Sequence, residues 1–325
     1  MPRRFVSQLG EHEAVEEVFL VSEKQLRTNR NGNLYLQMRL SDRTGSLTGM
    51  MWNANEQLYS SFNNGDYLRV RGTTQFYNGA LQMIVNHIER TDAAGVEESD
   101  FLTLTPPEVD RLSVQLGEML RSMQDYHLRN LAECYLMDER FMARLAAAPA
   151  GVKKHHAYRG GLLDHVVSLM RLARSVAPHY PSLQPDLLLM GAFLHDLGKI
   201  DELTYERDLG YSDAGQLLGH VVLALKLLDD KILEARRLSG EPFPEDLALQ
   251  LKHMIVSHHG QYEFGSPKLP MTLEAIALHL LDNLDAKMHS VGQLLREDAN
   301  TDSRWTPYQQ DLQRKFYKGS PPTQA

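Results

Sequence analysis

Polar and apolar residues alternate with a period of two in several short stretches of the first 90 residues. In residues 33–40, NLYLQMRL, every second side chain is apolar, a pattern typical of a strand with one buried face. The dipeptide Asn31-Gly32 before it indicates a tight turn, and residues 54–62 predict one or two helical turns. Strands are expected at residues 14–27, 33–40, 46–52, 66–76 and 80–88.

This order of elements predicts a small closed sheet. Five strands with a short helix after the third match the size and order of an OB-fold barrel. Another small barrel or a sandwich is the alternative fold for this part of the chain.

The period changes to that of a helix after residue 104. The stretch Thr105-Pro106-Pro107-Glu108 combines a capping box with proline at the first helical position. Apolar residues then recur at three- and four-residue spacing. In the last helical segment they form one stripe, made of Leu273, Ile276, Ala277, Leu280, Leu281, Leu284 and Met288. Helices are expected at residues 108–136, 138–147, 160–177, 185–196, 215–238, 244–258 and 271–290.

The chain is therefore expected to be multidomain, with a five-stranded barrel followed by an all-α helical bundle. Residues 91–100 have no periodicity and indicate a linker. The expected parts are an N-terminal arm at 1–13, the barrel at 14–92, a linker at 93–104, the helical domain at 105–300 and a C-terminal segment and tail at 301–325.

Composition restricts the class of protein. The 325 residues are 42% hydrophobic and 23% charged, which is typical of a folded protein. The formal charge of −8 argues against binding nucleic acid by bulk charge but leaves room for a local basic strip. No apolar run is long enough to span a membrane, and no secretory signal is evident. With Cys134 as its one cysteine, the protein is expected to be cytoplasmic.

Histidine is concentrated in the helical half, where 11 of the 14 histidines lie between positions 155 and 289. Several histidines and aspartates stand inside strongly apolar stretches, where an unpaired polar group would cost several kcal/mol. A shared metal ion would satisfy many of them at once. The members of this set are His165, His195 with Asp196, His220, His258 with His259, and Asp282.

Imidazole nitrogen and carboxylate oxygen together suit Mn²⁺, Co²⁺, Fe or Zn²⁺. Since successive helix positions differ by about 100°, His195 and Asp196 can both reach an ion only near the end of their helix. The carboxylate of Asp196 can bridge two ions, and Lys199 is placed to meet an anion bound there. A single histidine on an apolar helix face is more often an ordinary core residue, so the evidence lies in the whole set.

These stretches also resemble a known family. The motifs HHAYRGGLLDHV, GAFLHDLGKIDELTY, GHVVLALKLL and SHHGQYEFGSPKLPMTLEAIALHLLDNLDAK are similar to those of the HD-domain metal phosphohydrolases, and more narrowly of the YhaM family of bacterial 3′→5′ exoribonucleases. That family places an OB-fold before its HD domain. The resemblance covers roughly residues 14 to 315.

The resemblance implies a site with two divalent ions, with Mn²⁺ or Co²⁺ expected and Fe or Zn²⁺ as alternatives. His165, His195, Asp196 and Asp282 would hold one ion. Asp196, His220 and His258 would hold the other, with His259 as a ligand or a phosphate contact. Lys199 would hold a phosphate oxygen, and Asp285 and His156 would support the ligands from outside.

The implied reaction is hydrolysis of the terminal phosphodiester of single-stranded RNA, or also of single-stranded DNA, from the 3′ end. The barrel would guide the strand by combining positive charge with aromatic stacking. Its candidate contacts are Arg27, Tyr35, Arg39 and Trp52, although Trp52 could instead belong to the core. The helical surfaces permit self-association, and a homo-oligomer is expected.

Three other functions fit the same residues. An HD-domain phosphohydrolase could act on free nucleotides or cyclic dinucleotides, although a small substrate needs no strand guide. A di-iron oxygenase of the HD fold could use the same ligand order. A scaffold protein with a degenerate centre would be favoured if a ligand were missing, and none is.

Overall fold

A computed structural model describes residues 3–319 apart from 78, 93–94, 153–155, 206–208 and 299–302. Its contacts divide the chain into two compact units. One unit comprises Met1–Thr103 together with Val291–Ala325, and the other comprises Leu104–Ser290. Each unit is built around its own apolar core.

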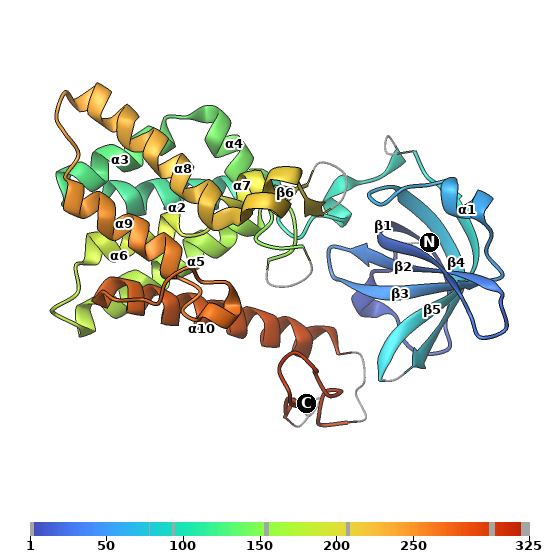
Figure 1. Cartoon of the computed structure of the whole chain (residues 1–325). Coiled ribbons are helices and arrows are strands. Elements are labelled where there is room, and N and C mark those ends of the chain that lie inside the picture. Colours follow the sequence, from blue (N-terminus) through green and yellow to red (C-terminus); the bar gives the residue numbers. More distant parts are fainter. Residues whose placement is uncertain are drawn as a thin grey trace. The chain divides into compact units, whose positions relative to one another are not determined.

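The first unit contains a closed barrel in the order β1-β2-β3-β5-β4 (Figure 1). Strands β3 and β5 pair in parallel and the remaining neighbours are antiparallel. This arrangement confirms the OB-fold expected from the alternating pattern. The elements of the barrel are β1 Ala14–Thr28, β2 Leu34–Asp42, β3 Gly45–Trp52, α1 Glu56–Ser60, β4 Tyr67–Tyr77 and β5 Ala80–Arg90.

Alternation along β2 fills the barrel core. Leu36, Met38 and Leu40 are fully buried, while Tyr35 and Arg39 between them are only partly buried. Because successive side chains of a strand point to opposite faces, one face of β2 lines the core and the other is presented to solvent. The predicted face assignment of this strand is therefore confirmed.

The second unit is helical, with one short two-stranded sheet. Among its described helices, α6 is the most deeply placed, since every residue from Leu187 to Leu194 is buried. Within the described residues, no helix is long and apolar enough to cross a membrane. The elements are α2 Pro106–Arg121, α3 Tyr126–Leu136, α4 Glu139–Ala147, α5 Gly161–Val176, α6 Pro185–Leu194, α7 Lys199–Glu202, β6 Leu203–Thr204, β7 Gly210–Tyr211, α8 Asp213–Ser239, α9 Glu245–Ser257 and α10 Leu273–Glu297.

Two predicted helices differ from the structure. The single helix expected over 108–136 is wrong, because the chain leaves the helix after Arg121 and begins a new one at Tyr126. The side chain of Asp125 caps the new helix by accepting from the backbone N–H of Leu128 at 2.8 Å. Aspartate is a preferred N-cap residue, but the apolar spacing continues on both sides of Asp125 and concealed the break. The last helix extends to Glu297, seven residues beyond its predicted end.

Most of the predicted apolar stripe of α10 is exposed to solvent and does not face the core. Ala277 is half-buried and Leu281 is buried. The other five members lie on the solvent side of α10 and are called the α10 stripe below. They are Leu273, Ile276, Leu280, Leu284 and Met288, with exposures of 53%, 44%, 58%, 48% and 66%.

Candidate metal centre

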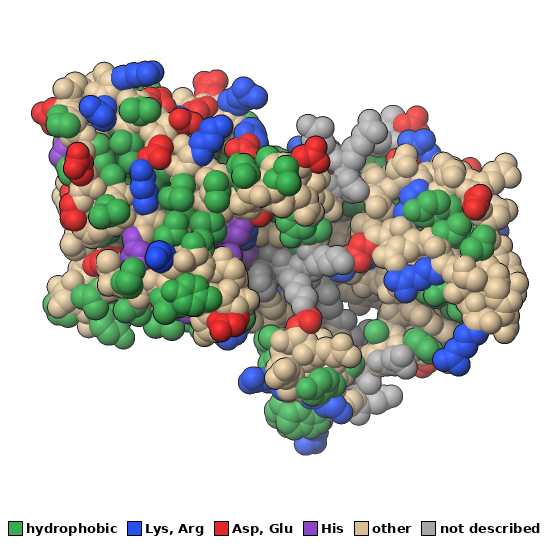
Figure 2. All heavy atoms as spheres, viewed as in Figure 1, with side chains coloured by type: hydrophobic (Ala, Val, Ile, Leu, Met, Phe, Trp, Pro, Cys, Tyr) green, Lys and Arg blue, Asp and Glu red, His purple; other side chains and the backbone are tan. Residues whose placement is uncertain are grey.

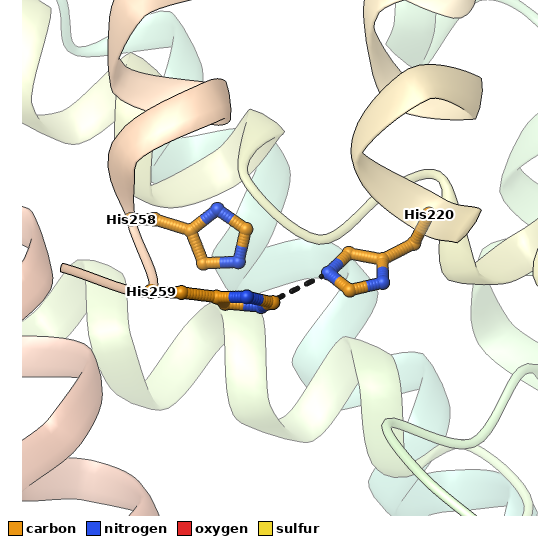
Figure 3. A group of neighbouring side chains, drawn as sticks. All are labelled: His220, His258 and His259. Carbon is orange, nitrogen blue, oxygen red and sulfur yellow. Dashed lines mark hydrogen bonds between the residues drawn. The ribbon is translucent and has the colours of Figure 1, made fainter. Parts of the chain in front are cut away.

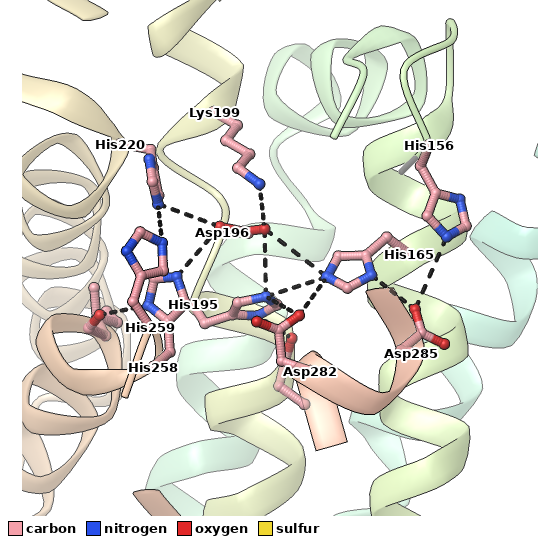
Figure 4. A network of polar contacts seen from close by, with 12 residues as sticks. His156, His165, His195, Asp196, Lys199, His220, His258, His259, Asp282 and Asp285 are labelled. Carbon is pink, nitrogen blue, oxygen red and sulfur yellow. Dashed lines mark hydrogen bonds and ion pairs between the residues drawn. The ribbon is translucent and has the colours of Figure 1, made fainter. Parts of the chain in front are cut away.

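Helix ends and helix faces from five parts of the second unit bring the predicted polar set together (Figure 4). His165 lies in the first half of α5, and Asp282 lies on α10. The C-terminal ends of α6 and α9 supply His195 with Asp196, and His258 with His259. His220 lies on α8, directly after a break in that helix at Gly219. All seven side chains therefore converge from segments that are spread over more than 100 residues of sequence.

The Asp196 carboxylate lies at the centre of this group. Its Oδ2 faces the Nε2 atoms of His195 at 3.4 Å and His165 at 3.8 Å. Its Oδ1 faces the Nε2 atoms of His220 at 3.5 Å and His258 at 3.6 Å. Each carboxylate oxygen thus serves a different pair of imidazoles, which is the arrangement expected of a carboxylate shared between two ions.

The first half of the centre consists of His165, His195 and Asp282, whose ligand atoms lie within 4.8 Å of one another. Oδ1 of Asp282 lies 3.2 Å from Nε2 of His165 and 3.8 Å from Nε2 of His195. The two Nε2 atoms are 3.3 Å apart. These are the three residues predicted to hold one ion together with Asp196.

The second half of the centre consists of His220, His258 and His259, again with ligand atoms within 4.8 Å of one another (Figure 3). The Nε2 atoms of His220 and His259 are 3.2 Å apart. Nδ1 of His259 is buried and has no hydrogen-bond partner among the residues that the structure describes. His259 is therefore a candidate metal ligand together with His220 and His258.

Four of the histidines are oriented from behind through Nδ1. A carbonyl or carboxylate oxygen can only accept, so each Nδ1 carries a hydrogen and each Nε2 faces the centre of the group, where it could give its lone pair to a cation. Holding the outer nitrogen in this way is typical of metal-ligating histidines. The acceptors are Asp285 Oδ2 for His165 at 2.9 Å, Ala192 O for His195 at 2.9 Å, Glu202 Oε1 for His220 at 3.1 Å and Ile255 O for His258 at 2.7 Å.

Protonation differs between the two halves. Burial would lower the pKa of His165, but its contacts with Asp282 and Asp285 raise that pKa to about 10. Burial, together with the neighbouring imidazole of His258, lowers the pKa of His259 to about 4. Burial also lowers the pKa of His258. Without an ion the first half therefore holds a proton that a cation must displace, whereas His258 and His259 present neutral nitrogens.

Lys199 lies directly beside the central carboxylate. Its Nζ is 2.7 Å from Oδ2 of Asp196, and its side chain is 19% exposed. Burial opposes the charge of Asp196, yet the ammonium of Lys199 and the imidazole of His195 hold the pKa of that carboxyl well below its usual range. Asp196 is therefore an anion, as a metal ligand must be.

The donor set fits a divalent cation by its chemistry and by its burial. Asp196 Oδ1 is buried and accepts no hydrogen bond from any part of the chain that the structure describes. A buried charged oxygen without a partner is costly, and a cation between it and the second half of the centre would supply the partner. Nitrogen and oxygen donors in this mixture suit Mn²⁺, Co²⁺, Fe or Zn²⁺.

Two glycines allow the helix ends to approach this closely. A Cβ at Gly198 would lie 1.9 Å from the carbonyl oxygen of His220, so only glycine lets the turn after Asp196 rest on the backbone of α8. Gly219 has a φ of +73°, a conformation that glycine adopts without strain. It breaks α8 and sets the direction of His220.

Some supporting residues were not predicted from the sequence. Glu202 is buried and also accepts from the backbone N–H of His220 at 2.9 Å. Ser168 donates to Oδ1 of Asp285 at 2.6 Å. A glutamate in a short helix and a serine one turn after His165 are too common in helices to stand out. The i, i+3 spacing of Ser168 from His165 was the only available signal.

The predicted supports Asp285 and His156 lie outside the first half of the centre. Nε2 of His156 is 3.9 Å from Oδ2 of Asp285, which in turn contacts His165. His156 is buried and stacks on the ring of His289 at a centroid distance of 3.8 Å. These contacts place both residues behind the candidate ligands.

In the barrel, three of the four predicted nucleic-acid contacts form a row across neighbouring strands. Arg27 pairs with Tyr35 across β1 and β2, and Tyr35 pairs with Trp52 across β2 and β3. The rings of Tyr35 and Trp52 are 5.3 Å apart, and Trp52 is 48% exposed, so it is not a core residue. Arg39 lies further along β2, 3.8 Å from Glu23.

Comparison with known proteins identifies both parts of the chain. Residues 162–287 match the family model described as HD domain, and residues 20–91 match an OB-fold nucleic acid binding domain. The chain is 33% identical over 286 residues to the 3′-5′ exoribonuclease YhaM of Geobacillus sp. (strain WCH70), covering 88% of this chain and 86% of the relative.

Two further relatives carry the same name. The protein of Shouchella clausii (strain KSM-K16) is 33% identical over 287 residues, covering 87% of this chain and 86% of its own. That of Listeria monocytogenes serotype 4b (strain CLIP80459) is 31% identical over 285 residues, covering 87% and 88%.

Proposed function

This chain belongs to the YhaM family of 3′-5′ exoribonucleases, and from that premise we propose that it hydrolyses single-stranded RNA from the 3′ end in a metal-dependent reaction. The observation that carries the proposal is the position of Asp196, whose two oxygens face two separate groups of imidazoles. The OB-fold in the same chain is consistent with a polymeric rather than a small substrate.

In this proposal two divalent ions occupy the centre, with Mn²⁺ or Co²⁺ as the expected metals and Fe or Zn²⁺ as alternatives. His165, His195 and Asp282 would hold one ion, and His220, His258 and His259 the other, with Asp196 shared. When bound, such ions act as Lewis acids on a phosphoryl group and lower the pKa of water to about 7.

The residues around the ligands keep the centre ready for the substrate. Glu202 and Asp285 fix the imidazoles of His220 and His165, so little reorientation is needed when substrate binds. Lys199 is partly exposed beside Asp196, and its ammonium would contact a phosphate oxygen. None of these steps needs a serine, threonine or cysteine nucleophile.

The barrel would hold the strand. Tyr35 and Trp52 present neighbouring rings, and Arg27 and Arg39 offer positive charge on β1 and β2. In this scheme residues 14–92 are the strand-binding domain and residues 105–300 the hydrolase domain. Single-stranded DNA is a second candidate substrate. A cytoplasmic location is part of the proposal, since the chain has one cysteine and so does not rely on internal disulfides.

A time course on one RNA labelled at either end tests the proposal. The protein is incubated with Mn²⁺, or with a chelator, and the products are resolved by size. We expect 5′-labelled strands to shorten in single-nucleotide steps, 3′-labelled strands to release labelled mononucleotide at once, and both to stay intact with chelator. Hydrolysis of free nucleotides or cyclic dinucleotides without RNA shortening would contradict the proposal.

A further inference from the structure

The solvent side of α10 is apolar over four turns. Between Leu273 and Met288, each exposed side chain belongs to the α10 stripe except Lys287. The stripe members follow one another at spacings of three and four residues, so they lie along one side of the helix. At 1.5 Å per residue the stripe is about 23 Å long.

This surface is separate from the metal centre. On α10 the buried Leu278 and Leu281 face the core, and Asp282 and Asp285 face the histidines. These residues lie between the stripe positions in sequence and on another side of the helix. Figure 2 shows green side chains gathered over the region where Figure 1 draws α10.

The segment before α10 extends the apolar area, with Tyr262, Phe264, Leu269 and Met271 exposed by 61%, 62%, 42% and 70%. Aromatic side chains such as those of Tyr262 and Phe264 bury roughly 150–250 Å² each. At these exposures the nine side chains offer on the order of 1,000 Å², compared with about 800 Å² per partner in a standard interface. Single folded chains rarely leave so large an apolar patch uncovered.

We propose that the α10 stripe is the contact surface for a second copy of this chain. In this pair two α10 helices pack antiparallel about a two-fold axis near Leu280, the middle member of the stripe. A two-fold interface needs one patch that is complementary to itself, and a straight apolar stripe meets that requirement. The centre of such an interface is depleted in charged residues, as this stripe is.

The one exposed charge on this side favours the antiparallel arrangement. Lys287 is seven residues from Leu280, so in an antiparallel pair the two ammonium groups lie near opposite ends, about 21 Å apart along the helices. In a parallel pair they would be neighbours and repel. A membrane surface fits less well, because amphipathic membrane helices carry several lysines or arginines beside their apolar face.

Cysteine cross-linking tests the pairing without reference to nuclease activity. The natural Cys134 is 2% exposed, so Leu280→Cys introduces one accessible thiol. Under a mild oxidant we expect the variant to form a covalent dimer rapidly at micromolar concentration. The matched control is Leu249→Cys on α9, where the leucine is 66% exposed, and it should cross-link at least ten times more slowly. Equal rates would overturn the proposal.

Mass in solution gives a second test. We expect the wild-type chain to have at least twice the monomer mass of 36.9 kDa by light scattering, and Leu280→Glu to reduce that mass at least two-fold. Leu249→Glu should leave the mass unchanged. Circular dichroism of each variant checks folding. A monomeric wild type, or an unchanged mass in folded Leu280→Glu, would overturn the proposal while leaving the proposed exoribonuclease activity intact.

Discussion

The carboxylate of Asp196 is the single side chain on which both halves of the metal centre depend, since each of its oxygens faces a different pair of imidazoles. Its role as a candidate metal ligand was predictable from the sequence, because a charged side chain in an apolar segment needs a strong partner. Its sharing between two groups was implied by the family resemblance, and the distances in the structure agree with it.

Removal of this carboxylate should therefore disable the enzyme. We expect Asp196→Ala to lose more than about 100-fold in RNA hydrolysis, because even supporting residues of metal sites are worth 10–100-fold. Bound metal, measured by elemental analysis, should fall in parallel. The control is Asp201→Ala, which removes an exposed carboxylate paired with Arg144. Near-normal turnover in Asp196→Ala would refute the shared-ligand role.

Residues that hold Nδ1 should affect metal affinity more than the fold. Glu202→Gln and Asp285→Asn keep the shape of the side chain but weaken the acceptor for His220 and His165. We expect the affinity for Mn²⁺, measured by calorimetric titration, to fall about 10- to 100-fold. Asp186→Asn, which alters a carboxylate that accepts from backbone N–H groups elsewhere, serves as the comparison. Unchanged affinity in both test variants would show that orientation through Nδ1 is unimportant.

At the scale of the element, the start of α2 followed directly from sequence. The stretch Thr105-Pro106-Pro107-Glu108 predicted a capping box, and the structure confirms it, since Thr105 N and Oγ1 both donate to Glu108 Oε2 at 2.8 and 2.7 Å. The break between α2 and α3 was not predicted, because apolar spacing continues through it. A new helix begins there because the side chain of Asp125 caps it by accepting from the backbone N–H of Leu128.

This capping box should contribute stability that depends on pH. The hydrogen bonds from Thr105 lower the pKa of Glu108 below its ordinary 4.5. A lowered folded-state pKa stabilises the protein above the unfolded pKa, and the contribution is lost as pH falls through the folded value. We expect Glu108→Ala to cost about 1 kcal/mol at pH 7, the usual net contribution of a hydrogen bond, and progressively less below pH 4.5. Urea unfolding of this variant and of the exposed Asp110→Ala measures it, and a pH-independent difference would contradict the assignment.

At the scale of the whole molecule, two units with different periodicities were distinguishable because strand and helix patterns repeat every 2.0 and 3.6 residues. The sequence was weaker evidence for the residues that contact nucleic acid, since exposed arginine and tyrosine are common on strands. Their arrangement depends on register, which pairs Arg27, Tyr35 and Trp52 across three strands. Such pairings arise between residues distant in sequence, and the alternation of one strand does not reveal them.

The row on the barrel predicts a defect in RNA binding. We expect Trp52→Ala to weaken binding of single-stranded RNA by about 1–3 kcal/mol, the usual contribution of one stacked base. Fluorescence anisotropy with chelator present, at fixed salt, measures binding without cleavage. Tyr180→Ala, which removes an aromatic ring of 59% exposure from the helical unit, controls for general surface effects. If both variants bind alike, the row has no part in holding the strand.

Gly198 has a consequence for how the centre comes into being. Because its missing side chain lets the loop after Asp196 touch the main chain at His220, the two halves of the candidate centre are joined by a backbone contact as well as by a carboxylate. We expect an added methyl group at residue 198 to push this loop away from α8, and so to shift His195 and Asp196 relative to His220. The distances from the central carboxylate to both groups of imidazoles would then change together.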